Sequence, residues 1–150
     1  MRNMMDINSI LNEYEEIIFE KSNMKSFDVT TKWAKQITKD AGIYAFFDQD
    51  KVVYVGESGS LKARMGDVRR TVNHTLRRNI GAKLYSDIEG YEKATSKKKF
   101  PEHIERLVNE YMETLHAVIV PVPFGRTEVE EYLVSKLKPM FNTKTRRGSA

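Results

Sequence analysis

Two tyrosines and one arginine are spaced so that they could act together on a charged substrate. The chain contains Gly42-Ile43-Tyr44, then Tyr54-Val55-Gly56, and Arg64 follows a glycine-serine turn. Tyrosines in strands are more often packing residues, and an isolated arginine is more often a solvated surface residue. The competing interpretation is a hairpin that carries both tyrosines on one face, with a following helix that returns the arginine to that face.

These residue types suit the hydrolysis of a phosphodiester. Attack by water adds negative charge at the phosphoryl oxygens, so the reaction needs a proton acceptor, positive charge on the phosphate and help for the leaving oxygen. Arg64 can bind phosphate oxygens through its forked, permanent charge. Tyrosine is an unusual base because its unperturbed pKa is about 10. A nearby cation favours the phenolate, so Arg64 or a metal ion could lower the tyrosine pKa.

The hydrophobic pattern predicts the elements that must hold these residues. Residues 42–47 and 52–55 are rich in β-branched and aromatic side chains, and the polar segment 48–51 between them predicts a hairpin. Gly66 is a weak point in one of the predicted helices, Asn73 is the predicted cap of the next, and residues 90–100 form a polar, basic loop. Helices are predicted over residues 6–21, 30–39, 58–72, 73–87, 101–114 and 127–138, and a third strand over 115–124, which Pro121 and Pro123 end or place at a sheet edge.

The same residues resemble the GIY-YIG nuclease superfamily. Residues 42–44 match the first half of that name and 54–56 the second, with Val55 in place of isoleucine. The stretch GESGSLKAR is similar to the family's glycine, polar turn, leucine and arginine, which is Arg64. Near the end of the chain, EEYLVSKLKPMFN resembles the family's last helix, with its glutamate at Glu130 and its closing asparagine at Asn142. The resemblance covers roughly residues 42–142, and its two halves occur in the right order.

The resemblance implies a role for each matching residue. Tyr44 is the preferred general base, and Tyr54 is the second active-site tyrosine. A glutamate at position 130 would hold a hard divalent cation, Mg²⁺ or Mn²⁺, which usually keeps several waters. Gly42 and Gly56 would keep the backbone uncrowded where phosphate approaches, and Asn142 would brace the site.

Glu130 also has a purely structural interpretation. Thr127-Glu128-Val129-Glu130 matches a capping box, in which the glutamate side chain only satisfies the helix start. Glu131 is adjacent and could be the ligand instead. The spacing of twelve residues to Asn142 and of four to Val134 favours Glu130.

One position departs from the family. Many members have a histidine or tyrosine one helical turn after the arginine, where this chain has Val68. His74 is the nearest substitute. Near a helix start capped by Asn73, the helix dipole would keep its ring neutral and able to accept a proton; the alternative is an exposed cap histidine. His103 and His116 have no motif support, and the three histidines do not have a metal-ligand spacing.

Basic residues gather in three places. Arg69, Arg70, Arg77 and Arg78 flank His74, Lys97 to Lys99 lie in the polar loop, and Arg146 and Arg147 end the chain. Such clusters suit phosphate backbones, although a charge run is usually a solvated face, and for the tail that is the better interpretation. We expect the arginine pairs around His74 to bind nucleic acid. No motif for sequence recognition is present.

Composition sets the outer limits. The chain has 150 residues, a net charge of +4 and no cysteine, so one domain is expected, an anionic partner is plausible, and disulfides and thiolate zinc sites are excluded. No segment reads as a membrane span or signal peptide, and we expect a cytoplasmic protein. GESGSLKA lacks the spacing of a phosphate-binding P-loop.

We therefore predict one α/β (α+β) domain, with a small three-stranded mixed or antiparallel sheet flanked by helices. Residues 1–40 form an N-terminal helical arm, 41–142 the GIY-YIG-like nuclease domain and 143–150 a basic tail. The predicted function is metal-dependent endonuclease activity on nucleic acid, with DNA favoured. The alternatives are a nucleic-acid-binding module on the same fold with reduced or absent catalysis, and a protein-association role for the helical arm. The oligomeric state is not predicted.

Overall fold

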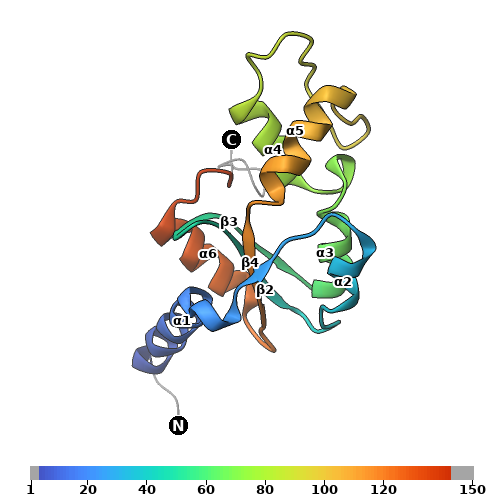
Figure 1. The fold of residues 1–150 in the computed structure, drawn as a ribbon. Helices are drawn as coiled ribbons and strands as arrows, with labels where there is room; N and C mark the ends of the chain where they lie inside the picture. Colours follow the sequence, from blue (N-terminus) through green and yellow to red (C-terminus); the bar gives the residue numbers. More distant parts are fainter. Residues whose placement is uncertain (1–3, 143–150) are drawn as a thin grey trace.

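The computed structural model describes residues 4–142 and centres on a four-stranded antiparallel sheet in the order β1-β4-β2-β3 (Figure 1). The strands are β1 (Lys25–Ser26), β2 (Gly42–Asp48), β3 (Lys51–Ser58) and β4 (His116–Pro121). The predicted hairpin and third strand are confirmed, and every pairing is antiparallel rather than mixed. The expected strand number is one too low because β1 has only two residues, too few for an alternating pattern to show.

The hairpin register places the two tyrosines on the same face. Tyr44 lies opposite Gly56 and Phe46 opposite Tyr54, so the tyrosines are diagonal neighbours across the strand pair. A tight turn connects the strands, with Gln49 at φ 55°. The central strand β2 has β4 on its other side, which fixes the hairpin within the sheet.

Both faces of the sheet are covered. Along β2, Tyr44 and Phe46 belong to one hydrophobic cluster, whereas Ile43, Ala45 and Phe47 belong to the other, as strand alternation requires. Figure 1 shows α1 and α6 together on one side, α2 and α3 on the other, and α4 and α5 at the upper end. The helices are α1 (Met4–Phe19), α2 (Thr31–Lys35), α3 (Leu61–Asp67), α4 (Thr75–Leu84), α5 (Glu102–Met112) and α6 (Arg126–Leu137), with short 3-10 turns η1 (Lys21–Asn23) and η2 (Thr71–Asn73).

The helix predicted over residues 58–72 is shorter than expected. Ser60 caps α3 by accepting a hydrogen bond from the amide of Ala63, and the helix ends at Asp67 with Val68 as its C-cap. The turn η2 then leads to His74, which is the N-cap of α4. The predicted Asn73 cap is therefore wrong by one residue, because the ring of His74 accepts the hydrogen bond that a cap must accept.

The last helix begins earlier than the capping box predicts. Gly125 is the N-cap of α6 at φ 81°, a left-handed conformation that favours glycine, and α6 starts at Arg126. Thr127 is thus already inside the helix. The capping-box interpretation of Glu130 is wrong, because it requires the N-cap at Thr127, whereas the N-cap of α6 is Gly125.

The N-terminal helix packs on the rest of the protein. Ile18 is buried in the cluster shared by β2 and α6, and Lys136 forms an ion pair with Glu15 at 2.9 Å. The division at residues 40 and 41 stays a prediction, and the predicted basic tail with Arg146 and Arg147 lies outside the described residues. No helix within residues 4–142 is long and apolar enough to cross a membrane.

Candidate active site

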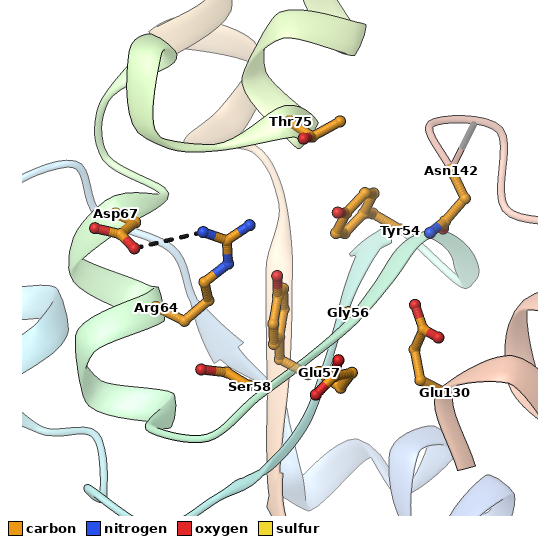
Figure 2. Close-up of a pocket in the computed structure, with 10 residues that line it drawn as sticks. Tyr54, Gly56, Glu57, Ser58, Arg64, Asp67, Thr75, Glu130 and Asn142 are labelled. Carbon is orange, nitrogen blue, oxygen red and sulfur yellow. Dashed lines mark hydrogen bonds and ion pairs between the residues drawn. The ribbon is translucent and has the colours of Figure 1, made fainter. Parts of the chain in front are cut away.

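One open cavity of about 670 Å³ brings together residues from five helices and strands. Tyr44 comes from β2, Tyr54 from β3, Arg64 from α3 and Glu130 from α6, and Figure 2 shows their side chains around a common space. Four further residues line the cavity wall and are not predicted from the sequence, although two of them directly follow Gly56 in the chain. These are Glu57, Ser58, Asp67 and Thr75.

The two tyrosines and His74 form a compact aromatic group. The Tyr44 and Tyr54 ring centroids lie 6.1 Å apart, and the His74 ring lies 5.8 and 5.5 Å from them. The Tyr44 hydroxyl oxygen is 2.8 Å from Nε2 of His74. Tyr44 is 1% exposed and Tyr54 is 8% exposed, so both lie almost entirely within the cavity wall.

The hydrogen bonds of His74 determine its tautomer. The amide of Leu76 donates to Nδ1 at 3.0 Å, and an amide can only donate, so Nδ1 carries no hydrogen. In the neutral ring the hydrogen therefore lies on Nε2, which donates it to the Tyr44 oxygen. The neutral ring therefore donates to Tyr44 and does not accept from it, because its acceptor nitrogen Nδ1 already accepts from the Leu76 amide at the start of α4.

The ring of His74 is neutral for a different reason from the one predicted. Complete burial is the main cause that lowers its pKa well below the ordinary histidine value, and Arg64, Arg78 and Arg77 lower it further. The alternative of an exposed cap histidine is wrong. Val68, where many family members have a polar residue, is fully buried in the core.

Arg64 does not lower the Tyr44 pKa below its ordinary value. Burial raises the pKa of Tyr44 well above that value, Tyr54 raises it further, and the positive charge of Arg64 only partly opposes them. Desolvation of the phenolate outweighs one nearby cation here.

Arg64 itself is held at the cavity wall. Its Nη1 donates to Oδ2 of Asp67 at 3.4 Å (Figure 2). The same nitrogen donates to the carbonyl of Asn73 at 3.3 Å. Its side chain is still 31% exposed. The guanidinium thus presents a permanent charge to the cavity while two contacts fix its position.

Glu130 faces the cavity and its neighbour does not. Glu130 is 2% exposed and lines the cavity, whereas Glu131 is exposed on the outer side of α6. In Figure 2 the Glu130 side chain extends from α6 toward Tyr54 and Asn142. Residues 4–142 contain no cluster of three or more histidine or carboxylate side chains able to hold a metal ion. The Glu130 carboxylate, facing an open cavity, fits a cation such as Mg²⁺, which keeps most of its ligands as water.

Close packing requires both motif glycines. A Cβ atom on Gly56 would lie 2.3 Å from the Tyr44 ring and hydroxyl, and one on Gly42 would lie 2.1 Å from the Val120 carbonyl oxygen. Protein atoms therefore fill the space beside Gly42, whereas Gly56 also lines the cavity, where room for phosphate stays a prediction.

Asn142 forms two hydrogen bonds with the backbone of β3, the strand at one edge of the sheet. Its Oδ1 accepts from the amide of Val55 at 3.0 Å, and its Nδ2 donates to the Val55 carbonyl at 2.9 Å. The adjacent Phe141 amide donates to the Val53 carbonyl. The segment thereby pairs with β3 much as a strand would and holds Tyr54, which lies between these two residues.

The four arginines around His74 are not equally exposed. Arg70 is exposed, Arg69 and Arg78 are half-buried, and Arg77 is 1% exposed. Arg78 donates to the carbonyls of Thr71 and Val72, and Arg77 forms an ion pair with Glu105. Two of the four therefore support the segment that carries His74.

Comparisons with known proteins give one family match and several structural matches. The profile of the GIY-YIG catalytic domain matches residues 11–149. The N-terminal endonuclease domain of UvrC from Thermotoga maritima, bound to magnesium, is similar at 16% identity and a TM-score of 0.40, covering 75% of this chain and 93% of that one. A point mutant of the same domain, bound to its catalytic divalent cation, gives 15% identity and 0.41 with the same coverage. No curated protein sequence matches the chain.

Proposed function

Because the chain belongs to the GIY-YIG catalytic domain family, we propose that it hydrolyses phosphodiester bonds of nucleic acid, DNA in particular, with Mg²⁺ or Mn²⁺ as cofactor. The family is one of endonucleases. The observation that supports activity in this member is the single cavity that holds Tyr44, Tyr54, Arg64 and Glu130.

Arg64 binds and orients the phosphate in this proposal. Its charge is permanent, and the contacts to Asp67 and Asn73 fix the guanidinium before substrate arrives. Glu130 would hold the divalent cation through its carboxylate, and the bound ion would supply further positive charge for the phosphate and the leaving oxygen.

Tyr44 takes the proton of the attacking water. The Nε2 hydrogen of His74 points at the Tyr44 oxygen, and such a hydrogen bond strengthens when the oxygen becomes charged. Burial keeps the phenolate scarce at neutral pH, so the rate should rise with pH. Tyr54, in ring contact with His74, is the second tyrosine of the site.

A nucleic-acid-binding module with reduced catalysis is the second candidate. The raised pKa of Tyr44 and the apolar Val68 favour it, because both depart from what an efficient base requires.

Plasmid nicking separates the two candidates. We expect conversion of supercoiled DNA to the nicked form with Mg²⁺ and none with EDTA. Glu130→Gln should abolish this cleavage, whereas Glu131→Gln, the matched change on the exposed side of α6, should not. DNA binding without metal-dependent cleavage by the unmodified protein would leave the binding module as the function.

A further inference from the structure

A second cavity lies beside the candidate active site. It has a volume of about 410 Å³ and is formed by the turn η2, the start of α5 and the basic loop before it. In Figure 1 that loop forms the outer end of the molecule beyond α4 and α5. Within residues 4–142, this cavity and the first one share no lining residue.

Arg77 is a buried cation in the wall of this cavity. Its Nε donates to Thr71 Oγ1 at 3.3 Å, and its Nη2 donates to Glu105 Oε1 at 3.1 Å and to Asn109 Oδ1. Its Nη1 has no hydrogen-bond partner among the described residues, and neither does the buried Nε of Arg69. Buried donors without partners are rare because each one loses its hydration, so an acceptor is missing from this cavity.

The charge of the lining identifies that acceptor as an anion. Five cationic side chains line the cavity, and Glu105 is the one carboxylate among its described residues. Both Glu105 oxygens are already engaged, Oε1 by Thr71 and Arg77 and Oε2 by the amide of Phe100. The cations are Arg69, Arg70, Arg77, Lys97 and Lys99.

The two cavities are joined by one short segment. Arg64 in the first cavity donates to the carbonyl of Asn73, while Thr71 and Val72 line the second cavity and Thr75 lines the first. A nucleic-acid strand carries phosphates at regular intervals, so one strand can place one phosphate at each site. Guanidinium groups donate hydrogen bonds to phosphate oxygens, and Nη1 of Arg77 is a buried donor without a partner among the described residues.

We propose that this second cavity binds a phosphate of the same nucleic-acid strand, away from the bond that is cut. The proposal rests on the proposed function for the identity of the strand. Arg77 and Arg69 form the inner wall, and Arg70, Lys97 and Lys99 form the exposed rim.

The rim lysines allow a test that leaves the fold intact. We compare Lys97→Ala/Lys99→Ala with Lys51→Ala/Lys93→Ala, which removes the same charge from exposed positions outside both cavities. Binding of a duplex DNA is measured in EDTA over a range of salt concentrations. The rim variant should bind more weakly, and its slope of log affinity against log salt should be shallower by up to about 0.9, the contribution of one phosphate contact. Equal slopes for the two variants would overturn the proposal.

A spectroscopic measurement identifies the ligand. The arginine side-chain NMR signals of Arg77 and Arg69 are followed while inorganic phosphate or the duplex is added. Both ligands should shift these signals. A shift with inorganic phosphate and none with the duplex would overturn the proposal in favour of a free anion. If the duplex shifts the signals and the rim variant loses slope while no cleavage occurs, the second cavity stands and the proposed catalytic activity alone fails.

Discussion

Nε2 of His74 lies 2.8 Å from the hydroxyl oxygen of Tyr44. Because Nδ1 accepts from the Leu76 amide, Nε2 carries the ring hydrogen and is the donor of this contact. One histidine thus starts α4 and supports the oxygen that we propose as the base. The family position after the arginine is Val68, so a residue further along the chain supplies the polar contact.

His74 should make the protein less stable in acid. Its folded pKa is lowered, so below the unfolded value of about 6.5 the unfolded chain binds a proton that the folded chain does not. The free energy of unfolding should therefore fall as pH drops below about 6.5, by at most about 1.4 kcal/mol per pH unit from this residue. His74→Asn keeps a cap acceptor for the Leu76 amide and removes the titration. Denaturant unfolding of both proteins between pH 7.5 and 5 should show a smaller loss for the variant, and parallel curves would contradict the assignment.

Gly56 and Gly66 should respond in opposite ways to alanine. A Cβ atom at Gly56 would meet the Tyr44 ring at 2.3 Å, so Gly56→Ala should cost about 1–3 kcal/mol and weaken cleavage by displacing the Tyr44 hydroxyl. No atom lies within 4 Å of the corresponding position on Gly66, inside α3. Gly66→Ala should stabilise by about 0.5–1 kcal/mol. Thermal unfolding of the two variants measures the difference, and a neutral Gly56→Ala would refute the packing role.

Arg64 and Arg77 should separate catalysis from folding. Arg64→Ala removes a partly exposed side chain and should abolish cleavage with little loss of stability and only slightly weaker DNA binding, since one of several phosphate contacts is lost. Arg77→Ala leaves Glu105 without its buried partner and should cost about 3–5 kcal/mol. The unfolding free energies in urea and the cleavage rates of the two variants test this prediction. A lower unfolding free energy for Arg64→Ala than for Arg77→Ala would contradict it.

The sequence predicts the hairpin well because its signals are local. Alternating apolar residues and a polar turn predict the two strands without reference to the rest of the chain. The bulge between Phe46 and Phe47, which brings Tyr54 onto the same face as Tyr44, is not visible in that pattern. The contact between Tyr44 and His74 joins residues 30 positions apart, and sequence spacing alone does not predict it. The burial of Arg77 is not predicted for the same reason, because its partners Glu105 and Asn109 belong to a helix that lies far along the sequence. The role of Gly56 is likewise visible only once the Tyr44 ring is opposite it.

The most direct test of the account is the DNA cleavage rate of Tyr44→Phe with Mg²⁺ present. The change keeps the ring and removes the hydroxyl. It leaves the Nε2 donor of His74 without its partner, which should lower the free energy of unfolding by about 1–3 kcal/mol. Far-ultraviolet circular dichroism and DNA affinity in EDTA should match those of the unmodified protein. We expect the cleavage rate to fall by a factor of about 10² or more, the usual scale for loss of a general base. Cleavage by Tyr44→Phe at the unmodified rate would contradict the account and leave this tyrosine as a packing residue.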